Sequence, residues 1–165
     1  MDEPLTLKRI SKLAIPEALA KAERYRLLNE PNQAESICLD ILEVEPDHQE
    51  ALVTLILAMT DQFGTERARR AQDVRGYVAR LIEPYQRAYY GGLVWERQAC
   101  AYLKRGKARG SAYGAFRDAM TLYEGAEALR PAGDDSVILR WNACVRALTR
   151  EGLAAPAVEV EQPLE

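Results

Sequence analysis

Residues 16–46 read PEALAKAERYRLLNEPNQAESICLDILEVEP, and this stretch decides the fold. Pro16 and Pro31 each stand where a helix would begin, because the first turn needs no amide proton and proline presets the helical φ angle. Small and apolar residues then recur at intervals of three and four, as one face of a helix requires. They are Ala18, Leu19, Ala22, Tyr25 and Leu28 in the first segment, and Ala34, Ile37, Cys38, Ile41 and Leu42 in the second. The stretch predicts two short antiparallel helices joined by a turn at Asn29 and Glu30, a pair that must stack on further pairs to bury its apolar faces.

Residues that begin or end helices recur along the rest of the chain. Proline, glycine and aspartate divide it into segments of ordinary helix length, and no alternating strand pattern bounded by turn signals interrupts them. We expect a break or bend in the fifth segment, because Gly91 and Gly92 each cost about 1 kcal/mol relative to alanine inside a helix. Asp134 or Asp135 is expected to cap the seventh helix. The further helices are predicted at residues 47–64, 66–82, from 85 or 92 to 104, 107–129 and 134–150.

These segments predict an all-α protein of about seven helices, in which antiparallel helix pairs repeat and stack. Residues 1–14 form an N-terminal segment or a short helix, residues 15–152 the repeat domain, and residues 153–165 a tail that we interpret as mobile because it mixes proline, glutamate and small residues without an apolar period. A generic helical bundle is the alternative architecture.

The first and third pairs resemble the tetratricopeptide repeat, whose pattern is W-x2-L-G-x2-Y in one helix, A-x3-F in the next and a closing proline. The second pair departs from this spacing. Matching positions in the first pair are Ala18, Ala22, Tyr25, Ala34, Cys38, Ile41 and Pro46. Those in the third are Trp95, Ala99, Tyr102, Gly106, Ala112, Phe116 and Ala119.

The resemblance implies a short right-handed α-solenoid of about three repeats with a capping helix at residues 134–150. It also implies a concave groove, lined by the first helix of each pair, that holds a peptide or a partner helix. In the family's register the groove residues are Leu19, Glu23 and Arg26, then Val53, Leu57 and Thr60, then Glu96, Cys100 and Lys104. Similar repeats grip a C-terminal carboxylate with a Lys/Asn/Arg clamp, which this set lacks. The size and architecture also look like those of type III secretion chaperones.

Charge and tyrosine are unevenly distributed. Residues 1–50 carry 6 basic and 11 acidic side chains, residues 51–123 carry 12 and 6, and residues 124–165 carry 4 and 8, for a net charge of −3. Seven of the eight tyrosines lie in the basic middle. Tyrosine and arginine commonly anchor interfaces, so Tyr85, Tyr89 and Tyr90 are expected to line a groove with the basic residues. A solvated basic surface without a partner is the alternative interpretation.

No pattern indicates catalysis. Cys38, Cys100 and Cys144 lie in apolar helical patterns, which favours buried, reduced thiols. The single histidine, His48, is expected in a turn or at a helix start. No second group of donor side chains accompanies it that could complete a metal site or form a catalytic site with it. We therefore predict no catalytic residue, metal or cofactor.

The leading functional hypothesis is a non-catalytic scaffold or adaptor that binds a protein or peptide partner and resembles a chaperone in architecture. A nucleic-acid-associated adaptor is the alternative, although nucleic acid is disfavoured as a partner, and a homodimer is also considered. No apolar run reaches the roughly 18 residues of a membrane span, and the start MDEPLTLKRI lacks a secretory pattern, so a cytoplasmic location is expected.

Overall fold

The computed structural model describes residues 4–106 and 109–155. Within them the chain is all α-helical and contains no strand. A short 3-10 helix at Lys12–Ala14 precedes the first α-helix, and it is the only regular structure in residues 4–14. The α-helices are α1 (Ile15–Leu27), α2 (Pro31–Val44), α3 (Gln49–Asp61), α4 (Ala71–Val78), α5 (Pro84–Lys104), α6 (Arg109–Glu127) and α7 (Ser136–Arg150). The tail prediction falls mainly on residues 156–165, outside the described part.

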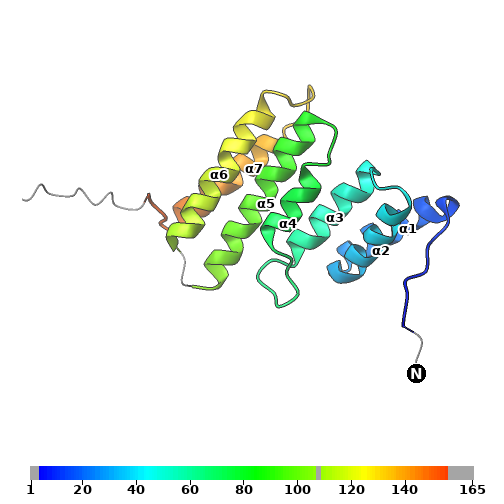
Figure 1. Cartoon of the computed structure of the whole chain (residues 1–165). Helices are drawn as coiled ribbons and strands as arrows, with labels where there is room; N and C mark the ends of the chain where they lie inside the picture. Colours follow the sequence, from blue (N-terminus) through cyan, green and yellow to red (C-terminus); the bar gives the residue numbers. More distant parts are fainter. Residues whose placement is uncertain (1–3, 107–108, 156–165) are drawn as a thin grey trace, which may run out of the picture.

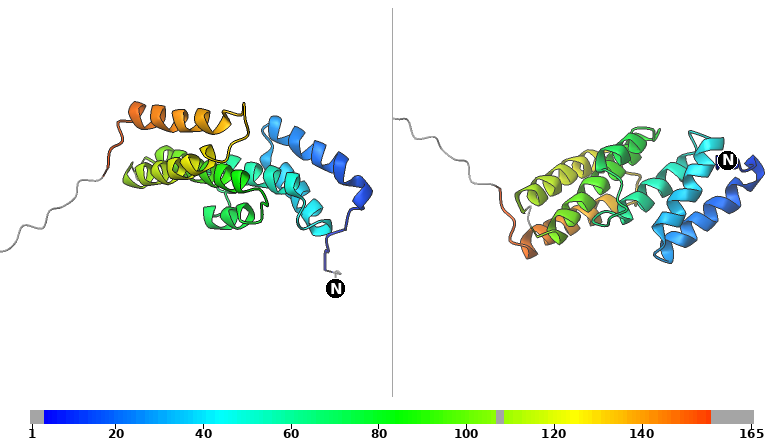
Figure 2. Two further views of the ribbon diagram at one scale, coloured as in Figure 1. Left: turned by 90° about the horizontal axis from the view of Figure 1, so that it is seen from above. Right: turned by 60° about the horizontal axis from the view of Figure 1, so that its bottom comes forward.

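Each helix packs antiparallel against the next one along the chain (Figure 1). Helices α5 and α6 form the most extensive pair. The odd-numbered helices also contact each other in turn, α1 with α3, α3 with α5 and α5 with α7. Seen from above, α1 and α7 lie on one side of the molecule and α4 on the other (Figure 2, left). We call the surface formed by α1, α3, α5 and α7 the odd-helix face.

The predicted helix boundaries are largely confirmed. Asn29 adopts φ of 60° in the turn between α1 and α2, and Gly64 turns the chain after α3 with φ of 85°. His48 is the N-cap of α3, where its Nδ1 accepts a hydrogen bond from the amide of Ala51 at 3.2 Å. Before α7 it is the side chain of Asp134, not that of Asp135, that accepts from the amide of Ser136, at 2.9 Å.

Helix α4 is much shorter than the predicted segment 66–82. Polar contacts hold the chain before it in an irregular loop. Thr65 Oγ1 donates to the carbonyl of Gln62 at 2.7 Å, and Arg69 Nε bonds Glu35 Oε1 of α2 at 2.7 Å. Because Arg69 reaches back to α2 from this loop, residues 66–70 do not continue a helix.

The predicted break at Gly91 and Gly92 is wrong, because α5 runs unbroken from Pro84 to Lys104. A Cβ on Gly92 would lie only 2.5 Å from Cε1 of Tyr123, and one on Gly91 would lie 3.3 Å from Cδ1 of Leu122. The glycines therefore permit α5 and α6 to approach closely, and that packing offsets their poor helix propensity.

The core consists of two apolar clusters. One joins α1 to α4 and receives Val94 from α5, and the other joins α5, α6 and α7. Cys38 and Cys144 are buried in them, as predicted, and burial raises the pKa of each thiol to about 12. Cys100 is exposed, which contradicts the prediction of three buried thiols, because its position on α5 faces outward from the odd-helix face.

Replacement of Gly92 by alanine tests the close approach of α5 and α6. The new methyl group would displace the buried ring of Tyr123, so we expect Gly92→Ala to destabilise the fold by about 2 kcal/mol. Urea unfolding followed by circular dichroism measures the difference.

Gly125→Ala is the matched control, because a Cβ on that exposed α6 glycine would meet nothing within 4 Å. It should leave the free energy of unfolding unchanged or raise it by up to about 1 kcal/mol. Equal effects of the two variants would contradict the packing explanation.

Candidate functional site

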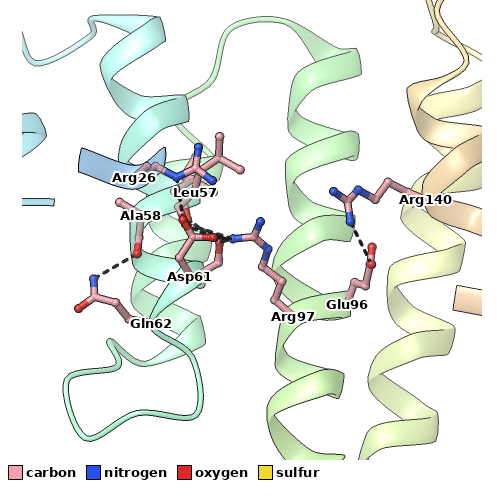
Figure 3. Close-up of polar contacts among 10 residues, drawn as sticks. Arg26, Leu57, Ala58, Asp61, Gln62, Glu96, Arg97 and Arg140 are labelled. Carbon is pink, nitrogen blue, oxygen red and sulfur yellow. Dashed lines mark hydrogen bonds and ion pairs between the residues drawn. The ribbon is translucent and has the colours of Figure 1, made fainter. Parts of the chain in front are cut away.

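A shared carboxylate links three odd-numbered helices (Figure 3). Asp61, at the end of α3, accepts from Arg26 Nε of α1 at 2.7 Å through its Oδ2 and from Arg97 Nη1 of α5 through its Oδ1. Arg97 Nη1 also lies within hydrogen-bond distance of Thr60 Oγ1, at 2.8 Å, and of the Leu57 carbonyl, at 3.2 Å. The three charged side chains are about a quarter exposed, so solvent screens this chain of ion pairs only partly.

A second polar cluster continues across the face to α7. Glu96 of α5 is 8% exposed, and its Oε2 accepts a hydrogen bond from the hydroxyl of Tyr123 on α6 at 2.6 Å. Its Oε1 lies 3.3 Å from Arg140 Nη1 of α7 (Figure 3). Burial, and then the neighbouring carboxylate of Glu96, raises the pKa of Tyr123. The face is thus bound together by polar contacts that run from α1 to α7.

The predicted groove residues fall into three groups. Glu23, Cys100 and Lys104 are exposed on the face. Val53 and Leu57 are half-buried, and Leu19 is buried. The polar contacts already described engage the side chains of Arg26, Thr60 and Glu96. The face therefore offers a few free side chains above a layer of internally paired ones.

A shallow hollow of about 210 Å³ brings together predicted residues from two helices. Thr60 lies on one side of it, and Cys100 and Lys104 lie on the other. Asp61 and Arg97 complete its polar lining, so Arg26 is connected to it through the shared carboxylate. Lys104 is the exposed cation at its rim.

Tyr85, Tyr89 and Tyr90 line a second hollow of about 490 Å³, which we call the tyrosine hollow. The rings of Tyr85 and Tyr89 stack with centroids 5.9 Å apart, and Tyr90 meets Tyr89 edge-on at 5.1 Å. The rest of the lining is acidic, polar and apolar: Glu83, Gln86, Leu129, Pro131, Asp134 and Ser136. The expectation that these tyrosines share a groove with basic residues is therefore wrong for this hollow.

Asp134 and Tyr85 are joined across the mouth of the tyrosine hollow. The Tyr85 hydroxyl lies 3.4 Å from Asp134 Oδ2, and burial together with this carboxylate raises the pKa of Tyr85 to about 12. Hydrogen bonds from Ser136 lower the pKa of the half-buried Asp134 below its usual value, so this carboxylate is ionised at neutral pH.

Most arginines of the basic middle segment make contacts within the molecule. Arg75 lies over the ring of Trp95, 3.7 Å from its centroid, and donates to Gln98 at 2.8 Å. Arg87 donates to the carbonyls of residues 81 and 82 at 2.7 Å, and Arg80 donates to the carbonyl of residue 46. The positive charge counted in the sequence is thus divided among separate structural contacts.

Sequence reasoning missed Asp61, Arg97 and Arg140 as site residues, and it named Asp134 only as a candidate helix cap. Asp61 stands one helical turn beyond Leu57, on the stripe already assigned to the groove, so its position could have been found from the spacing. That it would pair with arginines from two other helices could not.

No helix among the described residues is long and apolar enough to cross a membrane, and no group of three histidine, cysteine, aspartate or glutamate side chains in that part could hold a metal ion. Comparison with family models, curated proteins and solved structures found no match to this chain.

Removing the shared carboxylate tests the contacts between odd-numbered helices. Asp61→Asn should lower the free energy of unfolding by about 1 kcal/mol, because two partly buried ion pairs are lost and Arg26 and Arg97 are left facing each other. Urea unfolding at low and high salt measures the effect, which salt should reduce.

Asp73→Asn is the matched control, since Asp73 pairs with Arg70 along the same short segment and its side chain is 49% exposed. Its effect should stay within about 0.5 kcal/mol. If Asp61→Asn costs no more than this control, the shared carboxylate does not hold the helices together.

Tyr123→Phe tests the cluster at Glu96. We expect it to cost about 2 kcal/mol at pH 7, where a buried hydrogen bond to a carboxylate is lost. The raised pKa of Tyr123 favours the neutral phenol in the folded state. The stabilisation that the Tyr123 phenol provides is therefore complete below the pKa of about 10 that this group has in the unfolded chain. It is lost as the pH rises through the higher pKa of the group in the folded protein.

The stability difference between wild type and Tyr123→Phe should accordingly shrink above about pH 10, as measured by urea unfolding at several pH values. Tyr113→Phe, on the same helix, should show neither effect. A difference that stays constant with pH would contradict the assignment.

Proposed function

We propose that this protein is a non-catalytic scaffold of the tetratricopeptide type, which binds a segment of a partner protein on its odd-helix face. The single observation that carries the proposal is the polar chain Arg26–Asp61–Arg97, because it fixes α1, α3 and α5 relative to each other across one surface. A surface that is rigid before binding loses little conformational entropy when a partner docks. The stacked pairs and the contacts between odd-numbered helices support a solenoid with this surface on its concave side.

Exposed side chains on the face are those best placed to meet a partner. Glu23 of α1 and the residues Cys100 and Lys104 of α5 remain accessible above the paired layer. Arg26 is less suitable as a contact than the sequence predicts, because its guanidinium is committed to Asp61. Reversing its charge would bring two carboxylates together and would disturb the fold itself.

A protein partner is favoured over nucleic acid by the state of the basic residues. Arg75, Arg80, Arg87 and Arg97 contact other groups of this chain, so few of the arginines are free to neutralise phosphates along one path. The odd-helix face, in contrast, combines half-buried apolar side chains with isolated charges of both signs, as protein interfaces do.

Capture of partners by the immobilised full chain tests the proposal. Lys104→Glu and Glu23→Lys should each reduce the amount of a retained protein by several fold at constant input, measured by quantitative mass spectrometry after nuclease treatment. Arg117→Glu is the matched control, since Arg117 is exposed on α6, outside the face, and its reversal should change nothing.

Two results would contradict the proposal. One is retention that the α6 control reduces as much as Lys104→Glu. The other is retention that requires nucleic acid and falls steeply between 50 and 200 mM salt, which is the behaviour of phosphate binding.

A further inference from the structure

The tyrosine hollow has the geometry of an aromatic site. Three phenol rings from the first two turns of α5 line one open hollow of about 490 Å³, within the range of sites that hold small ligands. The ring of Tyr123 packs against the ring of Tyr89, and the two ring centroids lie 6.1 Å apart. Leu129 and Pro131 supply apolar surface on the side of the α6–α7 connection. The rings are thus held in place before any ligand arrives.

The charges around the hollow are unbalanced in favour of acid. Glu83 and Asp134 stand in its lining, and within the described part of the chain no basic side chain forms an ion pair with either. Arg130 lies nearby, but it pairs with Glu127 at 3.2 Å and with Asp135 at 3.6 Å.

Arg140 of α7 also approaches the hollow, because it interacts with the Tyr89 side chain, and its charge is paired with the buried carboxylate of Glu96. A cation that enters the hollow therefore meets the carboxylates of Glu83 and Asp134, neither of which forms an ion pair with a described residue, and the negative faces of aromatic rings.

We propose that the tyrosine hollow binds one arginine or lysine side chain of the partner segment. A guanidinium group can stack on the ring of Tyr85 or Tyr89 and donate to Asp134, while the alkyl stem contacts Leu129 and Pro131. This inference rests on the proposed function, because it names the chemistry that the partner segment presents. It also places the anchor at the α5–α7 end of the odd-helix face.

The isotope-labelled full chain, titrated with N-acetyl-arginine amide, tests the proposal by amide chemical shifts. Saturable shifts are expected in residues 83–90 and 129–136. N-acetyl-citrulline amide, which has nearly the same shape and no charge, should bind at least tenfold more weakly. Equal binding of the two probes, or shifts centred on another part of the chain, would overturn the proposal.

Asp134→Asn is the decisive variant, because an asparagine oxygen still accepts the amide hydrogen bond of Ser136 that begins α7. It should weaken binding of the arginine probe at least fivefold. Asp135→Asn removes the adjacent carboxylate, which is paired with Arg130, and should leave binding within twofold. Tyr85→Leu should also weaken binding at least fivefold, and a thermal melt checks that it remains folded.

If Asp135→Asn weakens binding of the arginine probe as much as Asp134→Asn does, the probe is attracted by acidic residues in general. That result would overturn the assignment of a cation site to the tyrosine hollow. The proposed function fails separately. If the probe binds as expected but no protein is retained by the odd-helix face, the cation site stands and the scaffold proposal falls.

Discussion

The packing of Tyr123 is the constraint on which the second half of the molecule depends. Its ring occupies the space that a side chain at position 92 would fill, so the close approach of α5 and α6 requires a glycine there. Its hydroxyl reaches Glu96, which in turn holds Arg140 of α7. The same ring supports Tyr89 at the back of the tyrosine hollow. One buried side chain therefore sets the spacing of a helix pair, the attachment of the last helix and the shape of a candidate site.

A different kind of interaction organises the first half. There the helices meet through aliphatic side chains of a common apolar cluster, and the charged contacts of Asp61 lie at its partly exposed edge. Asp61 accepts from arginines on both neighbouring odd-numbered helices, so it adds polar contacts to the apolar ones that these helices share. Each ion pair alone would contribute little to stability if it were fully exposed to water, but the two share one carboxylate that is only partly exposed. The first half of the protein thus combines apolar packing within and between helix pairs with polar contacts between its odd-numbered helices.

Much of the fold could be predicted from the sequence, because proline, glycine and the apolar period are local properties. Pro16, Pro31 and Gly64 stand within three residues of observed helix ends. The failures have nonlocal causes. Gly92 was predicted to break the helix because its contact with Tyr123, distant in sequence, could not be foreseen. Residues 66–70 were predicted to be helical because the bond between Arg69 and Glu35 of α2 could not be foreseen either.

For the candidate site, the sequence could predict which helices carry the residues but not which contacts their side chains make. Helical spacing placed Leu57, Cys100 and Lys104 on the odd-numbered helices, and the tyrosines of α5 do share a hollow. The partners of charged groups were not predictable, since Glu96 and Arg26 were chosen by register as groove residues and are engaged inside the structure. A repeat pattern specifies which way a side chain points, whereas its pairing depends on the helices stacked beside it.

The division of the core into two apolar clusters has a consequence for cooperativity. Helix α5 contributes to both, through Val94 to one and through Ala99 to the other, and it is the described element that the two halves have in common. In arrays of stacked units, each part contacts only its neighbours, so the halves unfold together only as far as the shared element couples them. A ligand held on α5 would therefore be thermodynamically linked to the opening of either half. Occupancy at one end of the molecule would then suppress fluctuations at the other, without any change of shape.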